Sequence, residues 1–478
     1  MRRLGVALPV LVVALALVAA PQPPVSDAAG RRVTFGRPVR VSANVNQSAA
    51  EPSIRASRDG RIYIVAPQGL TSGISRPDDN GGNDVIWRSN DDGKTWRFLG
   101  SFDRPAGGGD ADIAPDPSGD LWGSGLTLVN TTAAHSTDKG ETWDVNPVGT
   151  LETVVDRQWI DAFRGNTAFL TTGRIGEQSI LLSRLENTPT GPAVVFTRRI
   201  SNPGEEEYQW PGEIAVDIKR RKVYVGWNNS RDSVTDDNTN RDDIVVARSD
   251  VELPLNTTRS VVTKTQGDSF DSFVAVDTDN RGNVYAVWTE RRPKGKGGRR
   301  GWTNTYISVS QDKGKTWSRP RRLNNRKSPT TTFPWVVAGG GGKVAVAWYG
   351  TGRRGPSPED VTRKKLRGPK WKVWVAYSFN ATADNPRYKK KLAVRKPIHE
   401  GNVCTSGTGC ATGTRDLLDF FQLDLDACGE IVIAYTDNSR DVVGMGGDRT
   451  TNRPELISFV RQNGGRKFYG KPLNRKIC

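Results

Sequence analysis

The chain of 478 residues contains few histidines, cysteines and methionines, with 2, 4 and 2 copies respectively. The two histidines, His135 and His399, exclude a His-rich zinc site and leave little room for a histidine-dependent triad. No apolar run beyond residue 20 is long enough to cross a bilayer. By contrast, 51 glycines and 28 prolines fit many tight turns better than long helices. The length and the 8% aromatic content predict a folded chain with a sizeable core.

The first 28 residues look like a targeting segment rather than part of the fold. Met1-Arg2-Arg3 is a short basic start, 4–20 is apolar, and Ser26-Asp27-Ala28 matches a small-x-small cleavage pattern. This order predicts a signal peptide over 1–28, and an uncleaved membrane anchor stays open as the alternative. We therefore expect a secreted monomer whose mature chain, 29–478, forms one domain that is not embedded in a membrane.

The four cysteines all lie late in the chain, which agrees with export to an oxidising compartment. Four cysteines allow three pairings, and the sequence does not decide among them. Cys404 and Cys410 flank a flexible Thr-Ser-Gly-Thr-Gly loop that closes easily, which would leave Cys428 to pair with Cys478. No Cys-x-x-Cys spacing indicates a metal site.

The chain repeats one unit seven times, and this repeat is its strongest signal. Each unit has an apolar strand, a turn with Gly or charged residues, and a second apolar strand of period 2. In six units a third strand is expected to end on serine, at Ser89, Ser136, Ser183, Ser249, Ser310 and Ser378. The seventh third strand is expected at 456–460, and 33–41, 467–473 or both should complete the last unit.

Three of the serines open the same eight-residue turn, Ser-x-Asp-x-Gly-x-Thr-Trp. Asp and Ser side chains accept hydrogen bonds from the turn amides, Gly takes a positive φ, and Trp packs under the hairpin. The turn is thus predicted to be structural, not catalytic or metal-binding. Its residues are Ser89, Asp91, Gly93 and Trp96, then Ser136, Asp138, Gly140 and Trp143, then Ser310, Asp312, Gly314 and Trp317.

This turn resembles the Asp-box, or bacterial neuraminidase repeat, of the sialidase-like β-propellers. The resemblance implies an all-β fold of four-stranded antiparallel blades around an axis. Seven units predict seven blades, whereas sialidases have six, so six blades is the alternative. The polar, basic stretch 351–370 is expected to be an insertion in the sixth blade.

Propellers of this kind place functional groups on the face opposite the Asp-boxes. That face is built from the residues leading into the inner strands and from the loops after the second strands. It should carry a ring of carboxylates and arginines, and Arg grips a planar carboxylate or sulfate through two parallel hydrogen bonds. The alternative is that these charges pair with each other. The candidate ligand-binding residues are Glu51, Asp112, Asp271, Asp419, Arg157, Arg174, Arg231, Arg291, Arg353 and Arg440.

The catalytic residues of sialidases are only partly matched. Ala50-Glu51-Pro52-Ser53-Ile54 stands where the family has its first arginine motif. Asp79, in a loop that resembles the family's acid-bearing loop, would occupy the acid/base position, or is a plain turn aspartate. Glu213 and Tyr435 could form a Tyr–Glu pair. Whether the protein is an enzyme stays open. If it is one, the resemblance implies a sialidase-like glycoside hydrolase.

Charge is divided unevenly along the chain. Residues 1–280 carry 30 Lys and Arg against 37 Asp and Glu, whereas 281–478 carry 39 against 15, a net charge of +24. Such a field attracts polyanions, and we expect an anionic glycan or cell-surface polymer as the partner. Aromatic residues are not interleaved with the basic loops, which disfavours nucleic acid. No cofactor is required, although the acidic loop 232–243 could hold Ca²⁺.

Overall fold

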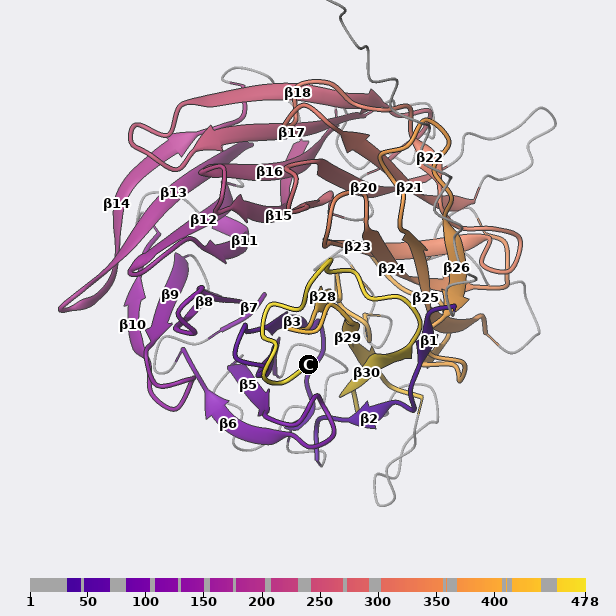
Figure 1. Ribbon diagram of the computed structural model, residues 1–478, viewed down its shortest axis with the longest axis horizontal. Helices are drawn as coiled ribbons and strands as arrows, with labels where there is room; N and C mark the ends of the chain where they lie inside the picture. The colour runs from indigo at the N-terminus through magenta and orange to yellow at the C-terminus, as the bar shows by residue number, and fades with distance from the viewer. Residues whose placement is uncertain are drawn as a thin grey trace, which may run out of the picture.

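The computed structural model is a ring of seven antiparallel sheets around one axis, a β-propeller (Figure 1). The predicted seven-bladed, all-β fold is confirmed, and the six-bladed alternative is wrong. None of the described residues forms a helix long and apolar enough to cross a membrane. The structure describes residues 32–43, 47–68, 83–103, 108–127, 130–149, 155–174, 178–202, 208–230, 242–269, 273–291, 302–355, 358, 368–405, 410, 415–439 and 454–478.

Each of the first six blades is a run of consecutive strands, with the first strand nearest the axis (Figure 1). Blade 1 contains β3 (Ser53–Ala56), β4 (Ile62–Pro67), β5 (Asp84–Ser89) and β6 (Arg97–Ser101). Blade 2 contains β7 (Asp112–Pro115), β8 (Leu121–Thr127), β9 (Asn130–Ser136) and β10 (Asp144–Pro147). Blade 3 contains β11 (Val155–Ala162), β12 (Thr167–Arg174), β13 (Ser179–Thr188) and β14 (Gly191–Arg199).

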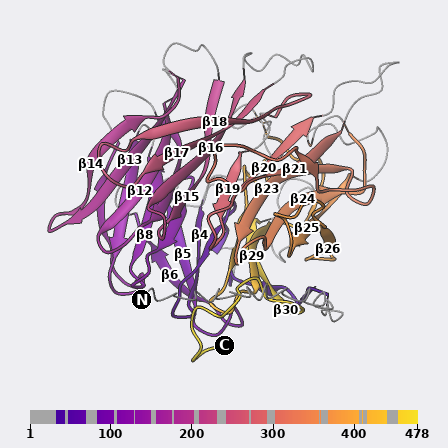
Figure 2. The same cartoon turned by 45° about the horizontal axis from the view of Figure 1, so that its top comes forward.

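Blades 4 to 6 repeat this order, and their outer strands lie at the rim of the ring (Figure 2). Blade 4 contains β15 (Tyr208–Asp217), β16 (Lys222–Ser230), β17 (Asp243–Asp250) and β18 (Thr257–Lys264). Blade 5 contains β19 (Ala275–Thr278), β20 (Val284–Arg291), β21 (Thr303–Ser310) and β22 (Arg321–Arg322). Blade 6 contains β23 (Thr330–Ala338), β24 (Val344–Thr351), β25 (Lys370–Ser378), β26 (Lys389–Leu392) and β27 (His399–Glu400), which also pairs with β25.

Blade 7 closes the ring with strands from both ends of the described chain. It contains β28 (Leu423–Leu425), β29 (Ile431–Asp437) and β30 (Leu456–Gly464), and both β1 (Thr34–Phe35) and β2 (Val39–Arg40) pair with β30. Of the two segments proposed for this role, 33–41 supplies the strands, whereas no residue of 467–473 is in a strand. The expectation that Ser183 ends its strand is wrong, because β13 continues to Thr188 and forms a long hairpin with β14.

Alternating apolar residues build the core between neighbouring blades. The second strands are buried along most of their length, and several carry a large buried aromatic residue, such as Trp227, Trp288 and Trp348. Eight of the 14 tryptophans are almost completely buried. Burial of such large side chains contributes most to the stability of the packed blades.

The three repeated turns have nearly identical hydrogen bonds. In the third of them, Ser310 Oγ donates to Asp312 at 2.8 Å, Gly314 N donates to Ser310 Oγ at 2.8 Å, and Thr316 Oγ1 donates to Asp312 at 2.6 Å. The turn tryptophans reach beyond their own hairpins: the Trp96 ring packs edge-on against Phe459 of blade 7 at 5.1 Å, and Trp317 Nε1 donates to Ser260 of blade 4. These turns therefore also link neighbouring blades.

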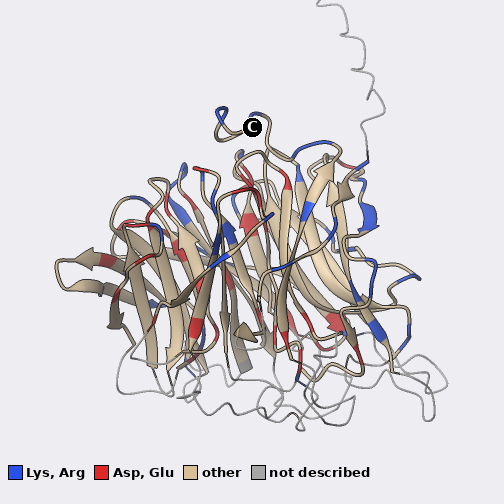
Figure 3. Cartoon of the chain, turned by 90° about the horizontal axis from the view of Figure 1, so that it is seen from below, with Lys and Arg blue, Asp and Glu red and all other residues tan. Residues whose placement is uncertain are grey.

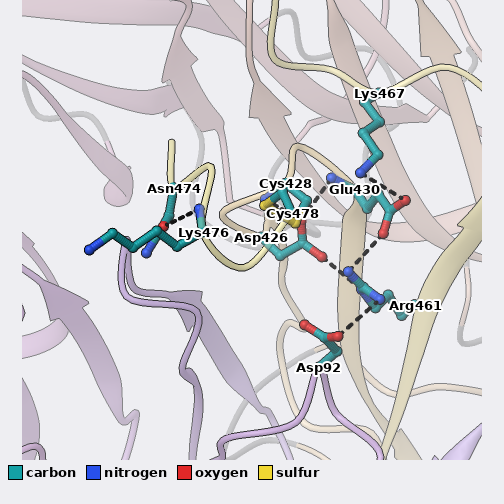
Figure 4. The surroundings of a disulfide bond; sticks show 9 residues. All are labelled: Asp92, Asp426, Cys428, Glu430, Arg461, Lys467, Asn474, Lys476 and Cys478. Atoms are coloured by element: carbon teal, nitrogen blue, oxygen red, sulfur yellow. Dashed lines mark hydrogen bonds and ion pairs between the residues drawn. A yellow bond between two sulfur atoms is a disulfide. The ribbon is translucent and has the colours of Figure 1, made fainter. Parts of the chain in front are cut away.

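The C-terminal segment crosses the turn face of the ring, where the C-terminus lies on one side of the molecule (Figure 3). Cys428 bonds to Cys478, and Cys404 bonds to Cys410, so the favoured pairing is confirmed. Around the Cys428–Cys478 disulfide, Arg461 forms ion pairs with Asp426 and Glu430, both at 2.7 Å (Figure 4). Phe468 N also donates to Gly429 O at 2.7 Å, which ties the segment to blade 7.

Candidate functional site

Residues just before the inner strands, or at irregularities within them, have strained backbones at equivalent positions. Glu51, Asp110, Arg157 and Phe333 have φ values of 60°, 54°, 62° and 52°. When the blades are aligned by the pairing of their first and second strands, all four residues occupy the same position. The left-handed backbone therefore recurs with the repeat. Left-handed backbone costs free energy for residues other than Gly, and such residues cluster at functional sites. The axis of the loop face is therefore a candidate site.

Charged side chains meet at this point in what we call the upper network: Glu51, Asp110, Arg157, Arg415 and Asp419. The Arg157 guanidinium bonds to Glu51, lies 3.3 Å from Asp110 and 3.9 Å from Asp419. Arg415 pairs with Asp419 from the side. The guanidinium also lies 4.5–5.0 Å from the centres of three aromatic rings, those of Trp159, Phe273 and Phe420. Arg157 is thus held by both charge and cation–π contacts.

Burial changes the protonation of the carboxyl groups here. It raises the pKa of Glu51 well above its usual value, although Arg157 opposes the shift. Burial and the nearby Asp110 also raise the pKa of Asp156 to about 6. A carboxyl group that titrates near neutral pH can serve as a general acid. The Glu51 side chain is 1% exposed, so its carboxyl group can act as an acid only if a ligand reaches it from the loop face.

A second layer of charge lies deeper along the axis, and we call it the lower network: Arg55, Asp112, Glu213 and Gln422. Arg55 bonds to Gln422 and donates to Glu213 at 3.2 Å. Asp112 accepts a hydrogen bond from Ser53 Oγ at 2.6 Å and from Ile160 N at 3.0 Å. Burial raises the pKa of Glu213 well above its usual value, with Arg55 acting in the opposite direction.

Three further aspartates bridge neighbouring blades at the level of Arg55. Asp161 accepts from Val216 N at 2.7 Å, Asp277 from Ala338 N at 2.6 Å, and Asp424 from Ala56 N at 2.7 Å. Burial is the largest cause of their raised pKa values, which are about 7, 8 and 6 respectively. Because each carboxylate joins the inner strand of one blade to that of the next, we assign these groups to the stability of the ring.

Three of the predicted carboxylates lie inside the ring rather than on an open face. Glu51, Asp112 and Glu213 are at most 5% exposed, and Arg157 is 2% exposed and surrounded by carboxylates. Glu51 pairs with Arg157 and Glu213 with Arg55, whereas Asp112 accepts hydrogen bonds from Ser53 and Ile160. Asp419 is also part of the upper network, with its side chain 20% exposed.

The predicted arginines are placed differently from one another. Arg174 ends β12 and is half-buried, Arg291 ends β20 and lies 3.5 Å from Asp268, and Arg353 follows β24 and is exposed. None of these three belongs to the upper network as the described contacts define it. The remaining predicted site residues lie outside the described residues: Asp79, Arg231, Asp271 and Arg440.

The two other catalytic candidates stand in different blades. Glu213, on β15, faces Arg55, and the next charges acting on its pKa belong to Asp277 and Asp112. Tyr435, on β29, is 1% exposed and affects the pKa of Tyr349, whose ring stacks on Phe421 at 3.9 Å. A Tyr–Glu pair therefore stays a prediction.

A group of cations without carboxylate partners covers the outer part of blades 5 and 6. We call it the basic sector: Arg321, Arg322, Arg326, Lys389, Lys390 and Lys391. Among the described residues, none of the six forms an ion pair with a carboxylate. Partial burial and, to a smaller extent, the charge of Arg322 lower the pKa of Lys390. β22 and β26, which carry most of them, are the outer strands of adjacent blades (Figure 1).

The described residues offer little for a metal ion. Within them, no three His, Cys, Asp or Glu side chains are arranged to hold one. The loop considered for Ca²⁺ lies outside the described residues except for Asp242 and Asp243. Asp242 accepts hydrogen bonds from Ser269 N and Oγ, at 2.5 and 2.8 Å.

Sequence reasoning missed several residues of the axis, notably Arg55, Asp161, Asp277 and Asp424. Their signal is present in the repeat, because all four occupy the penultimate position of their inner strands when the blades are aligned by pairing. Side chains two residues apart share one face of a strand. Arg55 follows Ser53 at this spacing, so both side chains lie on the same face of β3.

Comparisons with known proteins agree with the architecture only broadly. No protein-family model matches the chain, and no curated protein matches it in sequence. Among solved structures, a protein of unknown function from Dyadobacter fermentans is 13% identical with a TM-score of 0.48, covering 91% of this chain and 99% of its own. An α-L-arabinanase from Penicillium chrysogenum, complexed with arabinobiose, is 14% identical with a TM-score of 0.47, covering 89% and 98%.

A third similar structure is the α-L-arabinofuranosidase Arb93A from Fusarium graminearum, in complex with an iminosugar inhibitor. It is 15% identical with a TM-score of 0.47, covering 90% of this chain and 98% of its own. Similarity at this level carries no argument about function. The fold assignment therefore depends on the strand pairing of this chain itself.

Proposed function

We propose that this protein is a secreted propeller that binds an anionic glycan or cell-surface polymer through its basic sector. The observation that carries the proposal is that Arg322 and Lys390 lie on the outer strands of adjacent blades, where the charge of Arg322 acts on Lys390 and neither cation has an ion pair with a carboxylate among the described residues. Like charges held together at a surface create a positive potential that attracts a polyanion. Partial burial is the larger cause of the lowered pKa of Lys390, and Arg322 lowers this pKa further.

The distribution of charged contacts favours the basic sector over the axis as the place where an anion binds. Arg157 and Arg55 already contact carboxylates, so an anion at the axis would compete with groups of the protein itself. The exposed guanidinium groups of the sector are available for bidentate bonds to carboxylate or sulfate. Within the described chain, the sector lacks the competing carboxylates that surround Arg157.

A glycan is preferred among polyanions for two reasons. The three repeated turns resemble those of sialidase-like propellers, which act on sugars. The signal-peptide pattern at 1–28 and the two disulfides support export. An exported protein encounters the polymers of the cell surface. Export and the removal of 1–28 belong to this proposal.

The test is equilibrium binding of the full mature chain to dextran sulfate, polygalacturonate and neutral dextran, at an ionic strength of about 0.15 M. The variant replaces Lys389, Lys390 and Lys391 by Glu. Its control replaces Lys94, Lys139 and Lys219, exposed lysines on other blades, with the same change in net charge. The proposal predicts saturable binding of an acidic polymer that only the first variant abolishes. Absence of binding to both acidic polymers would contradict it.

Hydrolysis at the axis is the second candidate, favoured by the raised pKa of Glu51 and Asp156. Glycoside hydrolysis commonly uses two carboxyl groups, one protonated and one ionised. Asp79 and Glu213 are further candidates for these roles. Turnover of fluorogenic sialosides and arabinosides that Glu51→Gln or Asp79→Asn abolishes, with folding intact, would support this function. No turnover on any substrate would leave binding as the function.

A further inference from the structure

A cavity of about 240 Å³ opens between blades 5 and 6, away from the axis. Its lining includes Trp302, Asn304, Arg322, Asn324, Arg326 and Arg354. Asn304 lies on β21, Arg322 ends β22, and Arg354 follows the end of β24. All three positions are at strand ends of the loop face, so the cavity lies on the face opposite the repeated turns. Two basic stretches distant in sequence meet there.

The three arginines of the cavity indicate an anionic ligand. The lining, all within the described chain, contains no acidic residue. Arg354 is held over the Trp302 ring, with its guanidinium carbon 4.9 Å from the ring centre. An arginine positioned by an aromatic ring loses less conformational freedom on binding than a free one. Its planar fork matches a carboxylate or a sulfate.

Two of the three asparagines that line the cavity, Asn304 and Asn324, indicate that the same ligand also donates hydrogen bonds. Asn304 is fully buried, and no described protein group pairs with either its amide nitrogen or its amide oxygen. Asn324 donates through Nδ2 to Ser328 O at 3.0 Å, while its Oδ1 has no protein partner. Buried polar atoms need partners, and an ionised acid group supplies none to an amide oxygen. Hydroxyl groups both donate and accept, so they satisfy these amides.

An anionic group and several hydroxyl groups on one small molecule describe an acidic sugar. The indole of Trp302 adds an apolar wall, as sites for small ligands commonly do. The cavity volume of about 240 Å³ lies just below the range of roughly 300–1,000 Å³ that is typical of small-ligand sites, which favours a single sugar unit. We infer that this cavity binds one hexuronate or sulfated hexose unit of the glycan, an inference that rests on the proposed function.

The experiment measures the affinity of the mature chain for tetragalacturonate, glucose 6-sulfate, neutral maltotetraose and tetra-adenylate. Arg354→Gln and Arg326→Gln change exposed side chains, so both variants should fold. Arg259→Gln, an exposed arginine on β18, is the matched control. Loss of a charged hydrogen bond should weaken binding of the acidic sugar roughly 10-fold or more in each cavity variant. The control should stay within about 2-fold, the change expected of a surface substitution.

The outcomes separate this inference from the proposed function. Preference for tetragalacturonate identifies a carboxylate unit, and preference for glucose 6-sulfate a sulfated one. If Arg354→Gln and Arg326→Gln behave like the control while the Lys389–Lys391 variant still loses polymer, the cavity assignment is overturned and the basic sector stands. Stronger binding of tetra-adenylate than of either acidic sugar would overturn the ligand class. Equal binding of maltotetraose would overturn the role of the arginines.

Discussion

Arg157 and Glu51 form a buried ion pair across the axis, joining blade 3 to the segment that leads into blade 1. Both residues have left-handed backbones, with φ values of 62° and 60°. The pair is enclosed by aromatic rings and by two more carboxylates. We interpret the pair as a contact that stabilises the ring at the axis, and removing one partner tests this interpretation.

Replacing Arg157 by Met should leave Glu51 buried without its cation. Breaking a buried pair in this way costs about 3–5 kcal/mol of unfolding free energy. Urea denaturation measures the loss. The double variant Arg157→Met/Glu51→Gln should lose less than the sum of the two single variants, because it removes the unpaired charge. Additive losses would show that the two residues do not stabilise each other.

Asp312 should matter for stability although it lies in a partly exposed turn. Partial burial alone would raise its pKa, but hydrogen bonds from Thr316 and Ser310 outweigh burial and hold the pKa below the usual value. Asp312→Ala should lower the unfolding free energy by about 1–3 kcal/mol. Lys315→Ala is the control, because that residue contributes only its backbone N–H to the turn.

The acid dependence of this turn follows from the sign of the shift. A carboxylate whose pKa is lower in the folded state stabilises the fold above the unfolded value, about 3.9. That stabilisation is lost as the pH falls further. Asp312→Ala should therefore lower the unfolding free energy at pH 6 more than at the lowest pH at which the fold survives. An equal loss at both values would contradict the assignment.

The aspartates of the axis should give the opposite dependence. Asp161, Asp277 and Asp424 have folded pKa values of about 7, 8 and 6, above that of an unfolded aspartate. The folded state then holds more protons, so this part of the stability is complete below about pH 4 and falls as the pH rises toward 8. Thermal unfolding at several pH values from 5 to 8 measures the slope of stability against pH. Asp277→Asn should flatten it, and an unchanged slope would count against a protonated Asp277.

The two disulfides should contribute unequally. Cys428 and Cys478 are separated by 50 residues, whereas Cys404 and Cys410 are separated by 6. Closing the longer loop restricts the unfolded chain more, so Cys428→Ser/Cys478→Ser should lose about 2–4 kcal/mol. The Cys404→Ser/Cys410→Ser variant is the matched control and should lose less. The reverse order, measured by denaturation without reductant, would contradict this account.

The sequence predicts the ring far better than it predicts the site. Period-2 hairpins and the repeated turn identify the seven blades, because each blade reuses the same local chemistry. Arg55 and Asp277 escaped notice because a charged residue within an apolar strand shows its role only when the blades are superposed. The cavity beside Trp302 was not predicted, since it joins residues from two blades. The basic stretches of the sequence do contain Arg322 and Arg354, which line this cavity.

The most direct measurement of the central claim is hydrogen–deuterium exchange of the mature chain with and without polygalacturonate. The account predicts protection in 302–306, 319–329 and 353–355, the segments around the cavity and part of the basic sector. It predicts no change in 49–57, 108–115 and 155–161, which build the axis. Protection confined to the axis segments would contradict binding at blades 5 and 6 and would favour a ligand at the carboxylates of Glu51 and Asp156.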